Sequence, residues 1–284
     1  MAGSTIELNR LRAMEPGDID AVHALSVEVR WPHRPDDWRF VLEIGHGLVA
    51  TDEGGRVMGS AMWWPFGEDL ATIGMVIVSP RLQGRGTGRR LMREIFAAAG
   101  TRTIRLVATA AGQRLYESEG FRASQTITQY QGLAEPPSLP EDPRVRPAEE
   151  ADWAAIARLD AEAIGGDRAR MLAELKRVGS AVVLGAPGAA PDGFAICRPF
   201  GRGRVIGPIV ARAPEDAIAL AAFFMRAHEA MFLRVDTPER EGAFVDFVEA
   251  CGLAQVDRVV QMTRGTPPAT GPARTFGLTN QALG

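Results

Sequence analysis

The stretch IGMVIVSPRLQGRGTGRRLMREIF, residues 73–96, joins an apolar run to an amphipathic segment through a glycine-rich turn. The run ends near Val78, and the hydrophobic positions after the turn recur at helical spacing, which predicts a strand followed by a helix. Gly84, Gly86 and Gly88 stand at alternate positions, where they let backbone N–H groups approach a ligand without a Cβ in the way. Because a helix N-terminus follows directly, the turn is typical of an anion site.

The turn also carries Arg85, Arg89 and Arg90, so the expected anion is a phosphate. It lacks the Gly-Lys-Ser/Thr ending of P-loop nucleotidases, which disfavours that class. Its glycine spacing differs from G-x-G-x-x-G, and no acidic residue follows at the distance that a ribose requires, which disfavours a dinucleotide site. A plain strand-to-helix turn would not need three arginines around three glycines.

Composition limits the class of protein further. The chain has 284 residues, 46% of them hydrophobic, and a net charge of −3, which suits one large or two ordinary globular domains and disfavours a general nucleic-acid binder. No apolar run approaches the roughly 18 residues of a membrane helix, and Met1 to Thr5 show no signal-peptide pattern. We therefore expect a cytoplasmic protein without a membrane partner, in which Cys197 and Cys251 are buried free thiols.

A proline-rich stretch, residues 132–145, separates two halves that repeat each other. Residues 11–25 match residues 145–159, and residues 74–78 match residues 207–211, all at an offset of about 133 residues. An offset of that size indicates duplication of a whole domain rather than a solenoid repeat.

These patterns predict a first domain at 1–131, a linker at 132–145, a second domain at 146–265 and a tail at 266–284. The tail is expected to be loose, although Thr275 to Leu278 could add a strand. Each half should be a mixed α/β (α+β) domain, with an antiparallel meander leading into a strand–helix–strand unit. In the first half we expect strands near 6–14, 47–52, 56–66, 70–79, 103–109 and 123–131, and helices near 18–29, 35–44, 87–99 and 111–118.

Two motifs in the first half resemble those of a known family. Residues 83–88, QGRGTG, resemble the Q/R-x-x-G-x-G/A signature of the GCN5-related N-acetyltransferase (GNAT) superfamily, and residues 115–121 resemble its L-Y-x-x-x-G-F stretch. The resemblance covers Leu11 to Gln131 and implies two tandem acyl-CoA N-acyltransferase (GNAT-like) domains. In that family the loop holds the pyrophosphate of acetyl-CoA. The residues thereby expected to bind this co-substrate are Gln83, Gly84, Arg85, Gly86, Thr87, Gly88 and Arg89.

The resemblance also implies direct attack of a primary amine on the thioester within a ternary complex. The backbone of Val76 and Val78 would pair with pantetheine, the Val76 amide would stabilise the oxyanion, and Tyr116 would act as general acid on the leaving thiolate. Two departures are visible. Ala111-Gly112 stands where many members carry an asparagine, and residues 73–75 lack the carboxylate that the family often places there.

The general base is less well defined by the sequence. Glu28 is our candidate, because it precedes an aromatic cluster suited to the wall of an acceptor pocket. The cluster consists of Trp31, Pro32, His33 and Trp38. The other carboxylates on segments that flank this pocket are Asp36, Asp37, Glu68 and Asp69. No two histidines stand at metal-ligand spacing, so we expect no metal.

The second half has lost the anion-binding loop. Residues 212–217 read RAPEDA, without glycine and with two acids where an anion would bind. This half resembles the type-18 acetyltransferase domain, and we expect a scaffold or an acceptor-binding role for it. Residues 201–204, GRGR, are expected to form a hairpin turn. The residues proposed to line a cleft between the halves are Asp167, Arg168, Arg170 and Asp236.

The expected activity is transfer of an acetyl group from acetyl-CoA to a primary amine. Two alternatives stay open: an acyl-CoA-binding sensor without turnover, and a nucleotide-binding enzyme. The sequence does not define the acceptor, which could be a small amine, an amino acid, an antibiotic or a protein lysine, and it leaves a homodimer open.

Overall fold

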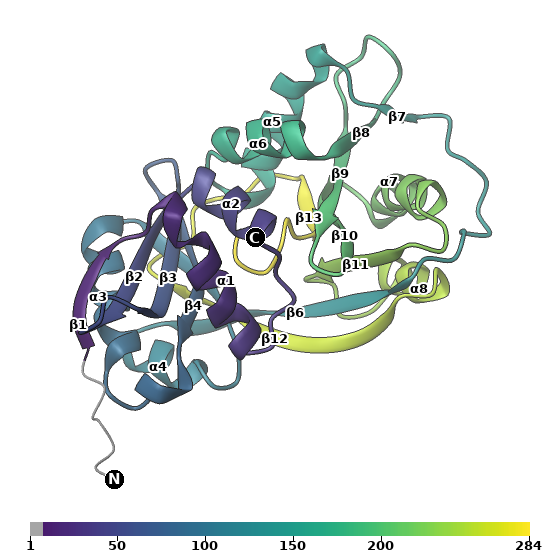
Figure 1. Ribbon diagram of the computed structural model, residues 1–284. Helices are drawn as coiled ribbons and strands as arrows, with labels where there is room; N and C mark the ends of the chain where they lie inside the picture. The colour runs from purple at the N-terminus through teal and green to yellow at the C-terminus, as the bar shows by residue number, and fades with distance from the viewer. Residues whose placement is uncertain (1–7) are drawn as a thin grey trace.

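A computed structural model describes residues 8–284. Its core is a 13-stranded sheet in the order β1-β2-β3-β4-β5-β12-β6-β11-β10-β9-β8-β7, with β13 paired to β10 outside this path. Figure 1 shows the long strands β6 and β12 crossing from one half to the other. The C-terminus lies at the centre of the molecule, between the two halves. The protein is therefore a mixed α/β fold in two halves, as predicted from the sequence.

The first half contains every element that the sequence predicts, with boundaries that differ by a few residues. Its strands are β1 (Leu8–Ala13), β2 (His46–Asp52), β3 (Val57–Phe66), β4 (Leu70–Val78), β5 (Thr103–Ala108) and β6 (Arg122–Leu133). Its helices are α1 (Ile19–Glu28), α2 (Pro35–Glu43), α3 (Thr87–Ala99) and α4 (Gln113–Ser118), with short 3-10 turns at Pro16–Asp18 and Pro80–Leu82.

The second half repeats this order. Its strands are β7 (Val145–Pro147), β8 (Ser180–Leu184), β9 (Gly193–Phe200), β10 (Gly203–Ala211), β11 (Phe232–Thr237), β12 (Ala254–Arg264) and β13 (Arg274–Gly277). Its helices are α5 (Trp153–Ile164), α6 (Ala169–Val178), α7 (Pro214–Ala227) and α8 (Ala243–Ala250), with a 3-10 turn at Glu150–Asp152. β9 and β10 form the predicted hairpin, and Cys197 and Cys251 are buried and free.

The last long strand of each half forms hydrogen-bonded pairs with strands of the other half. β12 lies between β5 and β6, and β6 lies between β12 and β11, all in antiparallel pairs. The β12–β6 ladder extends from the Ala254–Gln131 pair to the Thr263–Arg122 pair. The predicted boundaries near residues 131 and 146 thus divide the chain but not the sheet, and these exact boundaries stay a prediction.

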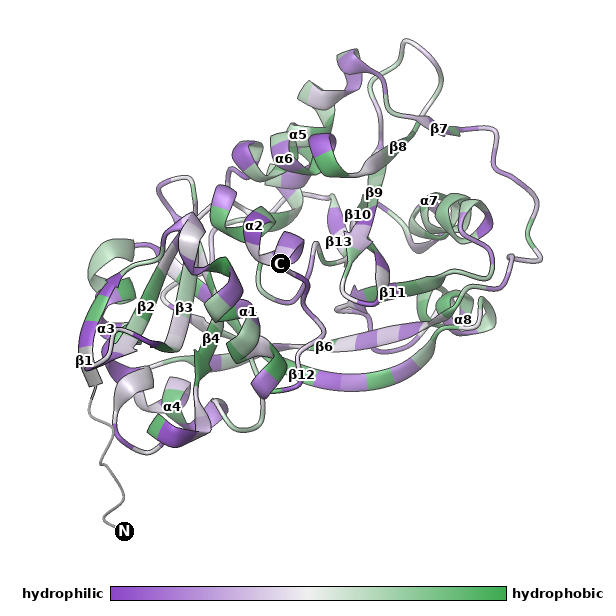
Figure 2. Cartoon of the chain, viewed as in Figure 1, coloured by the Kyte–Doolittle hydropathy of each residue, from purple (hydrophilic) through white to green (hydrophobic). Residues whose placement is uncertain are grey.

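Helices cover both faces of this sheet. Buried side chains of α1, α2, α5 and α6 share one apolar cluster, which joins the two halves on one face. On the other face α3 packs Leu91 and Ile95 against strand residues such as Ala61 and Ile73. Figure 2 shows β4 as an apolar strand and β6 as a largely polar one. Four polar residues of β6 line cavities: Ser124, Gln125, Gln129 and Gln131.

The sequence repeat is also a repeat of local structure. Arg12 donates two hydrogen bonds to Asp18, at 2.7 and 2.6 Å, and Arg146 donates two to Asp152, at 2.6 and 2.8 Å. Each carboxylate also accepts the backbone N–H three residues earlier, at 2.8 Å. These bonds, led by the one from arginine, lower the pKa of both aspartates and fix the entry into α1 and α5.

The C-terminal segment is packed into the middle of the fold. β13 pairs with β10, as the sequence allowed for residues 275–278, and Leu278 and Leu283 are buried. Arg168 donates to the carbonyl oxygens of Leu283 and Gly284 at 3.1 and 2.8 Å. The segment is therefore part of the structured interior, and the expectation of a loose tail was wrong.

Replacing Asp160 is expected to destabilise the protein strongly. Asp160 and Arg168 form an ion pair at 2.5 Å in which both side chains are fully buried. Asp160→Asn would leave a buried arginine without a counter-charge, which costs about 3–5 kcal/mol of unfolding free energy in urea titration. Asp36→Asn is the control, because the side chains of the Asp36–Arg39 pair are 76% and 59% exposed and such a pair contributes about 0–1 kcal/mol. Equal losses in the two variants would contradict the expectation.

Candidate functional site

The glycine turn between β4 and α3 is open toward solvent. Gly84 and Gly86 adopt φ of 76° and 78°, the left-handed region that favours glycine, and a Cβ at either would meet no atom within 4 Å. Gly86 precedes α3 without a side-chain hydrogen bond to cap it, so the first N–H groups of this helix lack a side-chain partner. Thr87 Oγ1 is buried and has no hydrogen-bond partner in the described part of the chain. These groups suit a phosphate.

Other side chains at the turn hold it in place. Gln83 donates from its amide to the Val78 carbonyl oxygen at 3.1 Å and so ties the turn to the end of β4. Arg89 donates to Glu119 at 2.9 Å and to Ser118 at 3.2 Å, which joins the start of α3 to the end of α4. The sequence predicted Gln83 and Arg89 as ligand-binding residues, and the structure shows in addition that their side chains stabilise the turn by these contacts.

A bulge interrupts β4 before the turn. The register with β3 shifts between the Ser60–Ile77 and Met62–Gly74 pairs, so that β4 carries one extra residue. Met75, in the bulge, has φ of 52°, although it is not glycine. Backbone in this region costs about 1–3 kcal/mol for such a residue and is concentrated at functional sites.

The bulge aims one amide away from β3. Ser60 donates from its hydroxyl to the Met75 carbonyl oxygen at 2.8 Å. Since the C=O and N–H of a trans peptide point in opposite directions, the N–H of Val76 points away from Ser60. The sequence gave no sign of Ser60, because the register shift that brings it to Met75 is not a local pattern.

β4 and β5 diverge at the same place. Their parallel pairing covers Leu70 to Ile73 on β4 and ends there, although β4 continues to Val78 and β5 to Ala108. On its β5 side, the second part of β4 therefore pairs with no strand of the described residues. The predicted site residues Val76 and Val78 both lie in this part.

Tyr116 lies on α4, beside the end of β4. It belongs to the apolar cluster against which Val76 and Val78 pack. The ring leaves 7% of the residue exposed and sits so close to Gly112 that a Cβ there would be 2.9 Å from it, which explains glycine at this position. Burial raises the pKa of Tyr116 to about 12. Its hydroxyl makes no hydrogen bond with residues 8–284 and is free to donate one.

A cavity of about 370 Å³ lies beside the bulge and between the two halves. The first half contributes the α1–α2 loop, the bulge and the end of β5, and the second half contributes the β9–β10 turn, β11 and β12. The C-terminal segment forms a further wall, where Ala282 fits so closely against Gly74 that a Cβ on Gly74 would lie 2.5 Å from it. A second cavity, of about 430 Å³, adjoins the first along Val107 and this segment.

The structure separates the candidates for a general base. Three members of the predicted aromatic cluster, Trp31, Pro32 and His33, line the cavity, whereas the fourth, Trp38, is fully buried and does not. Glu28 does not: it is exposed, accepts a hydrogen bond from Ser79 at 3.4 Å, and lines a shallow hollow elsewhere.

Two titratable groups of the α1–α2 region do line the cavity. Burial acts to raise the pKa of Asp37, but hydrogen bonds from Arg34 and from the Gly201 N–H outweigh it and hold that pKa below its ordinary value. Burial also lowers the pKa of His33 to about 4, so its imidazole is neutral at pH 7.

In the second half, the place that corresponds to the divergence of β4 and β5 is occupied by another strand of the protein, β13. β10 and β11 pair only over Arg204 and Val205 of β10 before they diverge. β13 then pairs with β10 from Ile209 to Ala211, the stretch that matches Val76 to Val78 of the first half. Together with the acidic first turn of α7, this filling leaves no room for a phosphate-bearing ligand there.

The predicted cleft residues are placed elsewhere. Arg168 is buried with Asp160, Asp236 is buried with Arg234, and neither lines the cavity at the bulge. Asp167 accepts the backbone N–H of Ala169, and Arg170 donates to the Glu43 carbonyl oxygen. None of the four is among the residues that line the cavity at the bulge, so the prediction of these residues as its lining was wrong.

Neither a metal cluster nor a membrane span is evident in residues 8–284. No three or more histidine, cysteine or acidic side chains there are grouped so that they could hold a metal ion. None of the helices in that range is long and apolar enough to cross a bilayer.

Comparison with known proteins agrees with this geometry. Residues 43–123 and residues 156–277 each match an acetyltransferase (GNAT) domain family, the latter the type-18 family expected from the sequence. The uncharacterized N-acetyltransferase YitH of Bacillus subtilis is 24% identical over 266 residues, which are 92% of this chain and 93% of YitH.

Solved structures share the whole fold. A putative acetyltransferase from Pyrococcus horikoshii superposes with a TM-score of 0.82 at 21% identity, over 100% of this chain and 98% of that one. A tandem GNAT protein from the clavulanic acid biosynthesis pathway gives a TM-score of 0.62 at 18% identity, over 92% of this chain and 100% of that one. With two matched domains in one chain, this protein belongs to the GNAT acetyltransferase family and is built from two such domains in tandem.

Proposed function

We propose that the protein transfers an acetyl group from acetyl-CoA to a primary amine by direct attack within a ternary complex. One observation carries the proposal: the bulge at Met75 lies where β4 and β5 diverge, between the open glycine turn and a cavity large enough for a small acceptor. The two substrates can then meet at a single point of the main chain.

The turn fits the diphosphate of coenzyme A. The uncapped start of α3, the open space around Gly84 and Gly86, and the unpartnered hydroxyl of Thr87 together offer donors to an anion. Backbone groups of Val76 and Val78 on the β5 side suit the amides of pantetheine, which would add to β4 as a strand does. The second half fills its own gap, so one acetyl-CoA per chain is expected.

The chain's own groups can then assist acyl transfer. Acetyl-CoA supplies the thioester whose carbonyl carbon the amine attacks. The Val76 N–H, turned away from β3, would donate to the carbonyl oxygen as negative charge develops on it. As the C–N bond forms and the C–S bond breaks, the Tyr116 hydroxyl would donate a proton to the departing sulfur, and the proton released by the attacking nitrogen would restore the hydroxyl.

The proposal is tested by measuring the release of free thiol from acetyl-CoA in the presence of amines and amino acids. Release that depends on the acceptor, with one acetylated product per thiol, is the expected result. Tight binding of CoA without release above background would instead indicate an acyl-CoA sensor. Thermal protection by ATP or NAD, with none by acetyl-CoA, would indicate a nucleotide-binding protein.

Tyr116→Phe is expected to lower kcat by about 100-fold, the usual contribution of a general acid, and to leave the affinity for acetyl-CoA unchanged. Phenylalanine preserves the ring that packs on Gly112 and removes only the hydroxyl. A general acid works below its pKa, and the pKa of Tyr116 is about 12. The wild-type rate should therefore show no alkaline fall from this group below pH 10, as a pH–rate profile would reveal. An unchanged kcat in the variant would exclude the role.

A further inference from the structure

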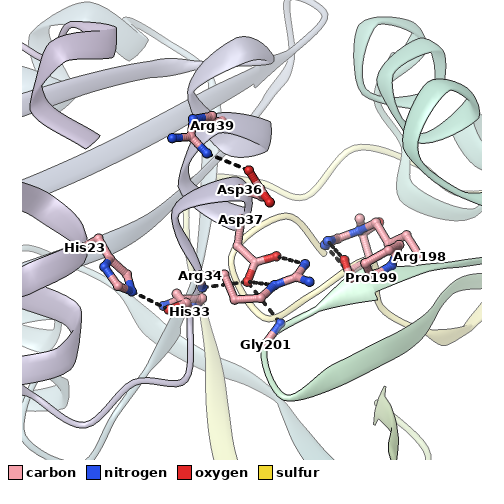
Figure 3. A network of polar contacts seen from close by, with 10 residues as sticks. His23, His33, Arg34, Asp36, Asp37, Arg39, Arg198, Pro199 and Gly201 are labelled. Atoms are coloured by element: carbon pink, nitrogen blue, oxygen red, sulfur yellow. Dashed lines mark hydrogen bonds and ion pairs between the residues drawn. The ribbon is translucent and has the colours of Figure 1, made fainter. Parts of the chain in front are cut away.

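The hairpin turn of the second half is held in a fixed position against the first half. The Gly201 N–H donates to Asp37 Oδ2 at 3.0 Å, and Arg34 donates to both oxygens of the same carboxylate, at 2.8 and 3.2 Å (Figure 3). Asp37 is only 3% exposed. Arg202, the next residue of the turn, thereby lines the cavity at the bulge with its side chain exposed.

Packing behind the turn reinforces this position. Arg198 is fully buried, with its guanidinium carbon 4.5 Å from the Phe40 ring centroid and 4.9 Å from that of Phe200. Figure 3 shows Arg198 and Pro199 on the strand that leads into the turn, beside Asp37. Side chains of both halves therefore hold the base of the hairpin that carries Arg202.

A second arginine lines the same cavity from the first half. Arg30 directly follows the C-terminal end of α1 and lines the cavity. Its N–H donates to the Val27 carbonyl oxygen at 2.9 Å, and the Trp31 N–H donates to the Ser26 carbonyl oxygen at 2.8 Å, a common way for a helix to end. Its φ is 62°, at a position where helices most often place glycine. Backbone in this region costs about 1–3 kcal/mol for a residue other than glycine and is concentrated at functional sites.

Arg30 and Arg202 differ in one respect from the third arginine of the cavity. Arg234 donates to both oxygens of Asp236 at 2.9 Å and is thus paired. Arg30 and Arg202 make no side-chain hydrogen bond or ion pair with any residue from 8 to 284. Arg30 and Arg202, both exposed residues of the cavity lining, are therefore available to a ligand that binds there.

The cavity also holds one carboxylate without an ion-pair partner within the described chain, that of Asp257 on β12, which accepts only the Arg258 N–H at 2.8 Å. Asp37, the other acid of the lining, is already paired with Arg34. The groups left for a ligand are thus two cations and one anion. This set suits a molecule that carries both an oxyanion and an ammonium group.

We propose that the acceptor is a small amine that also bears an oxyanion, such as a carboxylate, which Arg202 of the second half and Arg30 of the first half bind together. This inference rests on the proposed acetyl transfer and names its substrate class. Arginine suits this task because its planar guanidinium binds carboxylate and phosphate oxygens in pairs. The second half then contributes to recognition of the acceptor although it has no acetyl-CoA site of its own.

The test compares matched acceptors. The amino acids, their amides and their decarboxylated amines are assayed by thiol release, and aminoalkyl phosphonates show whether another oxyanion can replace the carboxylate. We expect kcat/KM to be about 10- to 100-fold higher for the acid than for its neutral analogue, the range of a charged hydrogen-bonded contact. Equal values for acids and amides would overturn the inference and leave acetyl transfer intact.

Two variants locate the effect. Arg202→Gln should raise KM for the acid about 10-fold or more, with kcat and the KM for acetyl-CoA unchanged, and should reduce the preference over the amide. Arg30→Gly should do the same without loss of stability, because glycine accepts a φ of 62°. Arg158→Gln is the control: this arginine is exposed on α5 and lines no part of the cavity. An unchanged acid preference in both test variants would refute the assignment.

Calorimetry separates failure of the inference from failure of the proposed function. Amino acids are titrated into the CoA-bound protein and into the same variants. Binding of acids that weakens in Arg202→Gln and Arg30→Gly, without thiol release from the wild type, would support the oxyanion site while refuting acetyl transfer. Absence of both release and selective binding would refute the two together.

Discussion

The first half alone, residues 1–140, is expected to be insoluble or unfolded and to release no thiol from acetyl-CoA. Its strand β5 pairs with β12 from Ile104 to Ala108, and within residues 8–284 β6 pairs only with β12 and β11, both of which belong to the second half. Removing the second half would expose the edge of β5 and leave β6 without any strand partner. Exposed, unpaired strand edges promote aggregation.

β6 cannot simply take the place of β12. β12 runs antiparallel to β5 and to β6, so β6 runs parallel to β5 and would have to pair with a different hydrogen-bond pattern. Coexpression of residues 1–140 with residues 141–284 is the matched control, since it restores both pairs and should restore solubility. Circular dichroism and size-exclusion chromatography provide the readout. A soluble first half with cooperative unfolding would show that the exchanged strands are dispensable.

The pairing of β6 and β12 with strands of the opposite half also shows which features of the fold sequence patterns do not predict. The strand–helix order of each half follows from local periodicity, and every predicted element of the first half is present. The identity of the strands that pair with β6 does not follow from local periodicity, because alternation along residues 122–133 defines the faces of the strand but not its neighbours. The repeat predicted two tandem copies of one fold, which is confirmed, but it did not predict that the last strands of the two copies pair within one sheet.

The site divides in the same way. The turn at residues 83–88 could be identified because glycines and a helix start are local features. Glu28 was a weaker choice: the chain reverses at Arg30, so Glu28 and Trp31 face different hollows although they are three residues apart. The stretch at residues 201–204 looks phosphate-like but was interpreted as a hairpin turn, because the sequence does not show the contact between Gly201 and Asp37 that holds the turn beside the cavity.

Gly86→Glu is expected to weaken acetyl-CoA binding by about 100-fold or more, measured by calorimetry. Like charges placed against each other cost several kcal/mol, and about 1.4 kcal/mol corresponds to each factor of ten. Gly86 immediately precedes α3, so the new carboxylate would stand at the helix N-terminus where the diphosphate is expected to bind. There it would compete with the diphosphate for the same N–H groups.

The backbone effect must be separated from this charge effect, because Gly86 has φ of 78° and any other residue there costs about 1–2 kcal/mol. Gly188→Glu is the matched control variant. Gly188 lies in the β8–β9 connection of the second half, has φ of 79°, and a Cβ there would also meet nothing within 4 Å. Both variants add the same charge and the same strain, so both should lose similar stability in urea. Only Gly86→Glu should lose acetyl-CoA. Equal affinity in the two variants would place the diphosphate elsewhere, since the turn would then tolerate a carboxylate in the space that the ligand needs.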